Sequence, residues 1–225
     1  MNAVAGFART ALALAALPRW AMSRFLGAPA SRPMLALALG SDESLVARAA
    51  GGDRQAFDDL YRRYVDVVWA RLGRLIGPDP EREDLLQQIF LDLFRALPRF
   101  RGDASLRTFL YRIVLNTASD HLKRRRRSPA AIPDDQLDEL MDADASPEQR
   151  VAERQRLART FAALDRLKPK KRIAFLLRVV EGLSLDEIAE LTDATPAAVA
   201  QRVRHAHREL KAMTERPRPS AWRRS

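Results

Sequence analysis

The sequence predicts an all-α protein of two small helical domains joined by a flexible acidic linker, and three observations support this. From residue 41 onward, apolar residues recur at steps of three and four, the period of an amphipathic helix, and no segment alternates in twos as a strand would. Ser, Thr and Asp residues stand before several of these runs, where helix N-caps are expected. A stretch rich in proline and acidic residues separates two basic blocks, as a linker would.

The composition excludes most catalytic classes. With no cysteine among 225 residues, disulfide scaffolds, thiol catalysis and cysteine-ligated zinc are excluded. The chain has three histidines, His121, His205 and His207, and the last two are spaced to point apart on a helix. No glycine-rich phosphate-binding motif is present. We therefore expect no catalytic residue, no metal site, no cofactor and no small-molecule substrate.

The basic charge is unevenly distributed, and this distribution indicates a polyanionic partner. The net charge of +10 divides into +4 over residues 1–41, +4 over 42–127, −6 over 128–150 and +8 over 151–225. Two basic blocks on either side of an acidic stretch are typical of two domains that face a nucleic acid.

Residues 1–40 form an N-terminal extension rich in Ala, Leu and Arg, which we expect to be flexible. The apolar run at residues 11–17 is short of the roughly 20 residues that span a bilayer. A secretory signal, a transit peptide, or a translation start at Met22 or Met34 are the alternatives that these residues leave open. We expect a cytoplasmic protein.

The first domain, residues 41–127, contains three long predicted helices. The first carries the stripe Phe57, Leu60, Tyr61, Tyr64, Val68 and Leu72. Asp79-Pro80 is typical of a cap and first-turn proline for the second, whose stripe is Leu86, Ile89, Phe90, Leu93, Phe94 and Leu97. Ser105 is placed to cap the third, which continues into the basic run Lys123–Arg127.

The linker, residues 128–146, holds two prolines and six acidic residues, and the second domain follows at residues 147–215. Ser146-Pro147 is predicted to begin a helix, Pro169 another, and Gly182 is a natural C-cap. Residues 216–225 form a short basic tail.

Residues 184–210 carry the most specific pattern. Ser184 and Glu187 form a capping box for a short helix, and Thr195-Pro196 then begins a longer one. The longer helix keeps Val199, Val203, Ala206 and Leu210 on one face and Gln201, Arg202, Arg204, His205 and Arg208 on the other. A short helix, a turn and a second helix with a basic face are typical of a helix-turn-helix that reads the DNA major groove. The alternative is a helical hairpin with a solvated basic face.

Aromatic residues accompany the basic run of the first domain: Phe94, Phe100, Phe109 and Tyr111. Rings beside a cationic groove suit single-stranded nucleic acid, because bases stack on the rings while phosphates follow the charge. By spacing, Phe94 and Phe109 are expected in the core, whereas Phe100, Tyr111 and Arg112 remain open between core and nucleic-acid contact. The residues by themselves thus predict a two-domain helical DNA-binding protein.

Several ordered motifs extend this prediction. Residues 45–127 carry Gly52-Asp53, Ala56-Phe57, the run Asp84–Phe90, Phe100-Arg101-Gly102, the run Thr108–Ile113, and Asn116 with Asp120-His121-Leu122. They resemble the second conserved domain of bacterial sigma-70 factors of the extracytoplasmic-function (ECF) group. Residues 147–212, with Glu181–Ser184, Glu187-Ile188-Ala189 and Val199 to Ala206, resemble the fourth domain.

This resemblance implies a dissociable initiation subunit, not an enzyme, with core RNA polymerase, promoter DNA and an anti-sigma factor as partners. Polymerase binding is implied for Asp84, Leu85, Gln87, Gln88 and Phe90, against the clamp helices of the largest subunit, with the flap of the second-largest subunit as a further contact. Reading and melting of the minus-10 element is implied for Phe100, Arg101, Ser105, Arg112, Asn116, Asp120, Lys123, Arg124 and Arg125. Reading of the minus-35 element is implied for Ser184, Thr195, Ala198, Gln201, Arg202, Arg204, His205 and Arg208.

This chain departs from the usual family residues at three places, with Gln88 for Glu, Phe109 for Trp and His205 for Arg. Two other classes compete with the sigma-factor prediction. A free-standing helix-turn-helix regulator would explain residues 184–210 but not the Asp84–Phe90 motif, and an RNA-binding accessory protein would explain the charge but not the helix-turn-helix.

Overall fold

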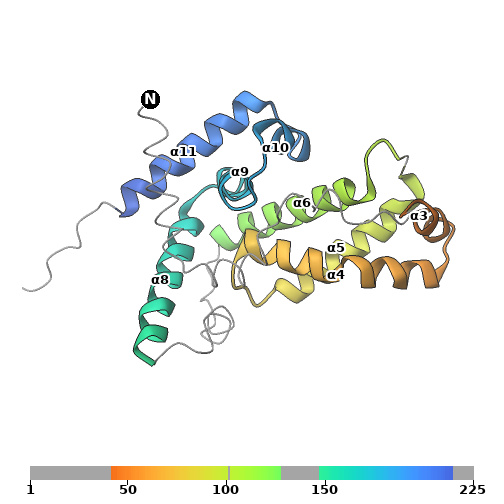
Figure 1. The fold of residues 1–225 in the computed structure, drawn as a ribbon, viewed down its shortest axis with the longest axis horizontal. Helices are drawn as coiled ribbons and strands as arrows, with labels where there is room; N and C mark the ends of the chain where they lie inside the picture. The colour runs from red at the N-terminus through yellow and green to blue at the C-terminus, as the bar shows by residue number, and fades with distance from the viewer. Residues whose placement is uncertain (1–41, 101, 128–146, 215–225) are drawn as a thin grey trace, which may run out of the picture.

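The computed structural model describes residues 42–100, 102–127 and 147–214, and every regular element within these ranges is a helix (Figure 1). The predicted all-α class is confirmed. In chain order the elements are α3 (Asp42–Ala50), α4 (Arg54–Ile76), α5 (Arg82–Ala96), the 3₁₀ turn η1 (Leu97–Arg99), α6 (Leu106–Arg127), α8 (Pro147–Arg166), α9 (Pro169–Val179), α10 (Leu185–Leu191) and α11 (Pro196–Thr214). The extension 1–40, the linker 128–146, the tail 216–225 and Arg101 lie outside the described residues. None of the described helices is long and apolar enough to cross a membrane.

Residues 42–127 are here called the N-terminal bundle. In this bundle α4, α5 and α6 pack around one apolar core. Asp53 caps α4 by accepting hydrogen bonds from the backbone amides of Gln55 and Ala56. The predicted apolar stripe of α4 is buried from Leu60 onward, except for Tyr61. Tyr61 lies at the edge of the stripe, and its side chain is exposed. Its ring packs on Phe90 of α5 with the centroids 4.7 Å apart.

The second predicted helix begins later than the sequence pattern suggests. Asp79 and Pro80 lie in the turn before α5, which begins at Arg82. The Asp79 carboxylate does accept the backbone N–H of Glu81, at 3.0 Å, but its other oxygen is turned inward to His121 and Arg125. Asp79 is therefore not the cap residue of α5; it is a buried residue whose hydrogen bonds join the turn to α6.

Residues 147–214, here called the C-terminal unit, begin with α8 at Pro147, as predicted. The Ser184–Glu187 capping box of α10 is formed in both directions. The Thr195 hydroxyl accepts the Ala198 amide at the start of α11, 3.2 Å away. Helix α9 ends at Val179 with Val180 as its C-cap, so Gly182, which the sequence predicts as the C-cap, lies two residues beyond it, with a positive φ of 71°.

The two units pack directly against one another. In Figure 1, α9 is seen nearly end-on where the two units meet, and α9 contacts α4 and α6 of the bundle as well as α11 of its own unit. Ile173, Ala174 and Leu177 of α9 belong to the same buried apolar cluster as the bundle core. Phe161 of α8 lies against the backbone at Gly77, where α4 ends. The two predicted domains are thus both present, and they share part of their core.

Candidate nucleic-acid and polymerase interfaces

Helices α10 and α11 form the predicted helix-turn-helix. Val199, Val203, Ala206 and Leu210 are buried, so the apolar face of α11 is the one that the spacing predicted. On the opposite face Gln201, Arg204 and Arg208 are exposed, while Arg202, His205 and Ala198 are half-buried. The side-chain oxygens of Ser184 and Thr195 are used in the two caps.

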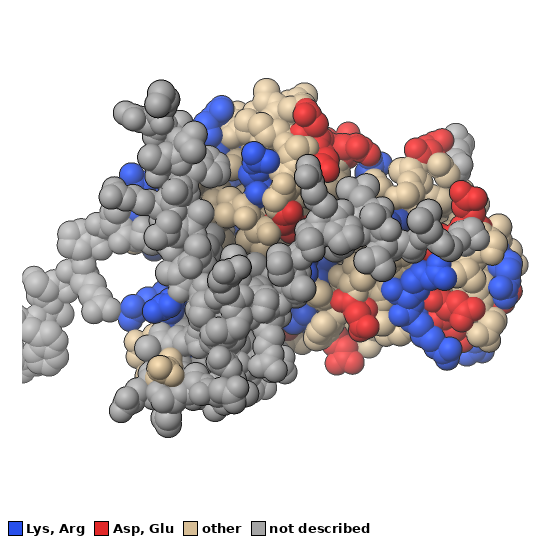
Figure 2. Space-filling view, viewed as in Figure 1, with Lys and Arg blue, Asp and Glu red and all other residues tan. Residues whose placement is uncertain are grey.

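The two helices of this motif carry opposite charge. In Figure 2, red side chains gather over α10, whereas blue ones lie over α11. The acidic residues of α10 are Asp186, Glu187 and Glu190. Asp186 and Glu187 lie in the first turn, where the helix dipole stabilises negative charge. The basic side chains of the motif therefore lie on α11, and acidic groups lie next to them on α10.

A second polar stripe runs along α6. Arg112, Asn116, Asp120 and Arg124 follow one another at four-residue steps, so they share a face of the helix, with Lys123 beside them. All of these except Arg112 are exposed, and Lys123 pairs with Asp120 at 2.7 Å. At the start of the helix, Ser105 accepts the Thr108 amide as predicted. Phe100 packs on Phe109, with ring centroids 5.2 Å apart, and both rings are half-buried against the core.

The side chain of Arg125, which the sequence predicts to take part in minus-10 binding, is largely enclosed in this structure. Its side chain is 9% exposed and donates to Asp79 at 2.8 Å, to Asp165 of α8 at 2.6 Å and to the carbonyl of Ile76 at 3.1 Å. Its position one residue after Arg124 rotates it from the exposed stripe to the inner face of α6. Arg125 is a structural residue that ties the end of α4 to α6 and α8.

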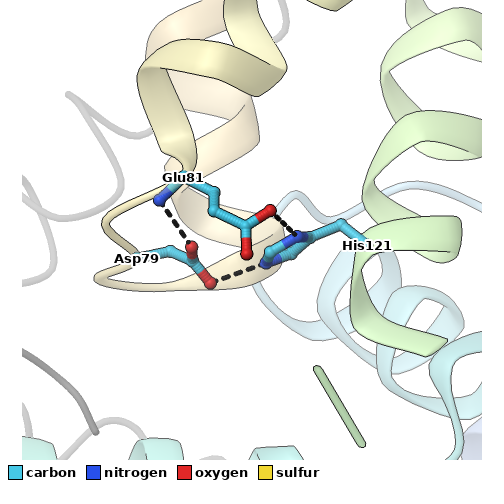
Figure 3. Close-up of side chains that lie close together, drawn as sticks. All are labelled: Asp79, Glu81 and His121. Atoms are coloured by element: carbon cyan, nitrogen blue, oxygen red, sulfur yellow. Dashed lines mark hydrogen bonds and ion pairs between the residues drawn. The ribbon is translucent and has the colours of Figure 1, made fainter. Parts of the chain in front are cut away.

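The carboxylates of Asp79 and Glu81 each face one ring nitrogen of His121 (Figure 3). His121 Nε2 is 2.6 Å from Asp79 Oδ2, and Nδ1 is 3.5 Å from Glu81 Oε2. These are the residues among the described ones that could be considered for a metal ion. However, a nitrogen–oxygen distance of 2.6 Å is a direct hydrogen bond and leaves no space for an ion between those two atoms, and Arg124 and Arg125 add positive charge beside them.

The pKa of Asp79 reflects these contacts. Burial by itself raises the pKa of this carboxyl, but the His121 hydrogen bond and charge, the Glu81 amide and the Arg125 guanidinium together outweigh burial and lower it below the ordinary value. Asp79 is therefore ionised, and the cluster is a hydrogen-bonded support for the turn between α4 and α5.

Helix α5 presents the predicted polymerase-binding residues in two groups. Asp84, Gln87 and Gln88 are exposed, and Gln88 donates to Asp92 one turn later. Leu85 and Phe90 are only 5% and 3% exposed and lie in the core of the bundle. These two residues lie on the apolar side of an amphipathic helix, which is the side that packs inward.

Sequence reasoning missed a buried polar group between the two units. Tyr111 donates its hydroxyl proton to Glu181 at 2.7 Å, and the guanidinium of Arg71 stacks on the Tyr111 ring, 3.4 Å from its centroid. Arg71 and Arg74 lie 3.5 and 3.8 Å from the Glu181 carboxylate. Burial and the Glu181 charge raise the pKa of Tyr111 well above its ordinary value, so the hydroxyl remains a donor. No local pattern indicates this group, since Tyr111 lies 40 residues from Arg71 and 70 residues from Glu181 along the chain.

The helices, the helix-turn-helix and the exposed polar faces define a class of protein, and comparison with known families agrees. The family described as Sigma-70 region 2 matches residues 60–128, and the family described as Sigma-70, region 4 matches residues 157–210. The chain belongs to the sigma-70 family, in its ECF group, and is a sigma factor of promoter-specific transcription initiation.

Particular relatives support the same assignment over most of the chain. RNA polymerase sigma-H factor of Pseudomonas aeruginosa is 32% identical over 179 residues, which are 75% of this chain and 91% of that protein. ECF RNA polymerase sigma-E factor of Escherichia coli K12 is 30% identical over 177 residues, covering 76% of this chain and 92% of that protein. Among solved structures, CnrH in complex with the cytosolic domain of CnrY has a TM-score of 0.51 and 26% identity, covering 77% of this chain and 97% of that one.

Proposed function

We propose that this sigma factor docks on core RNA polymerase through the exposed face of α5, with Asp84, Gln87 and Gln88 as the contact residues. The support is a contiguous polar surface on a helix whose opposite side is fully packed. Tyr61 and Leu91 are exposed large side chains on α4 and α5. Tyr61 contacts Phe90 of α5, so this region of the bundle also offers apolar area to a partner. The flap of the second-largest subunit is the proposed partner of the C-terminal unit.

DNA recognition is divided between the two units in this proposal. The exposed side chains of α11, chiefly Gln201, Arg204 and Arg208, read the minus-35 element in the major groove, supported by their position on the outer face of a second helix of a helix-turn-helix. The stripe of α6 from Arg112 to Arg124 reads the minus-10 element, with Phe100 and Ser105 at its beginning. A flipped base in that element needs unpairing, which costs a few kcal/mol.

A protein antagonist is the further partner that we propose. CnrH was solved in complex with the cytosolic domain of CnrY, and its likeness to this chain extends over both units. Because such a complex and core RNA polymerase are both cytoplasmic, we assign this sigma factor to the cytoplasm.

Competition for core RNA polymerase tests this function directly. The purified chain is mixed with core enzyme and a labelled housekeeping sigma factor, and displacement of the label is measured. We expect displacement by the wild-type chain and at least about tenfold weaker displacement by Asp84→Ala/Gln87→Ala, because these side chains lie at the centre of the proposed contact.

Leu85 is not substituted in this test, because it is buried and its loss would disturb the fold. The matched control is Arg99→Ala, a substitution at an exposed residue outside α5. Equal displacement by the α5 variant and the control would contradict the assignment of α5. No displacement by the wild-type chain, together with sequence-specific duplex binding, would instead support a free-standing regulator.

A further inference from the structure

A pocket of about 240 Å³ lies where α6, α8 and α9 meet. In Figure 1 this is the place where the C-terminal end of α6 reaches the junction of α8 and α9. The side chains that the proposed function assigns to polymerase and DNA are not among its lining residues. The lining comes from both units, with Leu122, Arg125 and Arg126 from α6 and with Asp165, Arg166, Leu167 and Arg172 from α8, α9 and the turn between them.

Two buried guanidiniums form part of this lining, and one carboxylate holds both of them. Arg172 is 1% exposed and Arg125 is 9% exposed. Arg125 donates to Oδ2 of Asp165 at 2.6 Å, and Arg172 donates to Oδ1 of the same carboxylate. Arg172 also donates to the carbonyls of Leu75 and Ile76, at 2.9 and 2.8 Å. These bonds fix the two guanidiniums in place, and they engage both oxygens of the carboxylate that lines the pocket.

Two further arginines of the lining, Arg126 and Arg166, are exposed. No other described residue forms a hydrogen bond or an ion pair with either of them. Four guanidiniums and one carboxylate thus line the pocket, a net charge of +3, or of +2 when Asp79, which also binds Arg125, is counted. Because like charges repel, an anion in this pocket would be attracted by all four arginines.

The chemistry and the size of the pocket favour one class of anion. A guanidinium presents paired N–H donors that match the oxygens of a phosphate group. A terminal phosphate carries close to two negative charges at neutral pH, and it projects from its molecule, so it can enter a pocket. Sites for whole drug-sized ligands begin at about 300 Å³, so this smaller pocket suits the phosphate end of a ligand. Leu122 and Leu167 are buried and add an apolar border to it.

We propose that this pocket, here called the arginine pocket, binds the terminal phosphate or diphosphate group of a small molecule. Arg126 and Arg166, which are exposed, bind the phosphate oxygens, and the buried Arg125 and Arg172 supply fixed positive charge beside them. Because Arg126 belongs to α6 and Arg166 to α8, a ligand that binds both joins the two units. This site is separate from the contacts proposed for polymerase and DNA.

Calorimetric titration of the full-length chain with inorganic pyrophosphate, in the absence of divalent metal ions, tests the arginine pocket. The pocket variant is Arg126→Gln/Arg166→Gln. The matched control is Arg127→Gln/Arg159→Gln, which removes the same charge from exposed residues of the same two helices that do not line the pocket. We expect the wild type and the control to bind pyrophosphate, and the pocket variant to bind at least about tenfold more weakly than the control. Absence of binding by the wild type, or equal weakening in both variants, would overturn the proposal.

The urea midpoint, measured with and without excess pyrophosphate at constant ionic strength, is an independent readout of the site. A ligand that binds only the folded chain raises its stability as the ligand concentration exceeds the dissociation constant. We expect the midpoint to rise for the wild type and the control, and to rise much less for the pocket variant. An equal rise in all three chains would reveal a general effect of the salt and would overturn the proposal.

Both substituted side chains of the pocket variant are exposed, so we expect this variant to fold, as circular dichroism would verify. If the double variant does not fold, the single changes Arg126→Gln and Arg166→Gln replace it, with Arg127→Gln and Arg159→Gln as their controls. We then expect about threefold weaker binding of pyrophosphate by each pocket variant than by its control. Equal binding within both pairs would overturn the proposal.

A mixed-sequence duplex of about 20 base pairs distinguishes DNA as the source of the phosphate. We expect the pocket variant and the control to bind this duplex equally, because both lose the same charge. Weaker duplex binding by the pocket variant than by the control would assign these arginines to DNA and would overturn the assignment to a small molecule. Failure of the proposed function is distinguishable, because the wild-type chain would then fail to displace the housekeeping sigma factor from core polymerase, whether or not it binds pyrophosphate.

Discussion

Arg172 is a single side chain whose hydrogen-bond partners come from both units: the carbonyls of Leu75 and Ile76 in the bundle and Asp165 in the C-terminal unit. Burial lowers the pKa of its guanidinium, and the Asp165 carboxylate opposes this by stabilising the charge. The carbonyls that it caps are the last of α4, and these would otherwise lack donors at a buried helix end. Arg172 therefore satisfies polar groups that neither unit could satisfy without the other.

Arg172→Met is expected to lower the free energy of unfolding by about 3 kcal/mol, the lower end for breaking a buried ion pair, because Asp165 keeps Arg125 as a partner. The measurement is the urea midpoint of the full chain by circular dichroism. Lys170→Met is the control, since Lys170 is exposed two residues earlier on the same helix, and it is expected to change the midpoint little. A similar midpoint for both variants would contradict the assigned role.

Asp79 makes the stability of the bundle sensitive to acid. Its pKa is lowered in the folded protein, so its contribution to stability is present above the ordinary carboxyl pKa and is lost as the pH falls through the folded value. The groups facing this carboxylate are His121, Glu81 through its amide, and Arg125.

The test compares the wild-type chain with Asp79→Asn from about pH 6 to about pH 3 in urea. We expect the wild type to be the more stable at the upper end and its advantage to shrink toward the lower end. Asp58→Asn, at an exposed position of α4, is the control and should give a curve parallel to that of the wild type. A constant difference between wild type and Asp79→Asn across the range would contradict the assignment.

At the scale of the elements, the junction between α4 and α5 determines where α8 can lie. Gly77 ends α4 with a φ of 80°, which side chains other than glycine rarely adopt. A Cβ atom at this position would lie 2.7 Å from two ring atoms of Phe161, so the absence of a side chain also provides the space for α8. The helix end and the interface thus depend on the same residue.

Gly77→Ala is expected to be more destabilising than Gly52→Ala, by about 1–3 kcal/mol. Both residues have positive φ, at 80° and 88°, so both substitutions carry the backbone strain, but a Cβ at Gly52 meets nothing within 4 Å. The readout is the urea midpoint, and the difference should shrink in a Phe161→Val background, where the ring is removed. A difference that persists in that background would place the effect in the backbone and not at the interface.

At the scale of the whole molecule, charges of opposite sign face different surroundings. Carboxylates of the C-terminal unit face basic side chains of the bundle, and other basic side chains face solvent, where they can attract a polyanion. The outer face of α11 and the stripe of α6 carry the basic side chains that face solvent, while Asp165, Glu181 and Glu190 face inward to the bundle. An overall charge of +10 favours association with nucleic acid. The inward carboxylates bind Arg71, Arg112 and Arg125 of the bundle within the chain.

The individual helices could be predicted because their determinants are local. The capping box of Ser184 and Glu187, the Thr195 cap and the Ser105 cap depend on residues within four positions of each other, and all are formed. The apolar spacing of α11 likewise predicted its buried face. The predicted start of α5 was wrong because Asp79 makes tertiary contacts instead of capping the helix. The predicted burial of Tyr61 was wrong because this residue lies at the edge of the apolar stripe.

The sequence by itself thus determined the helical class, the two units, the helix-turn-helix and the family resemblance. Only the tertiary structure decided which cations face solvent. Arg124 and Arg125 are adjacent in a basic run, yet one faces solvent and the other is buried between Asp79 and Asp165. The physical reason is that a helix turns about 100° per residue, and the carboxylates that select one of the two arginines lie 40 or more residues away in sequence.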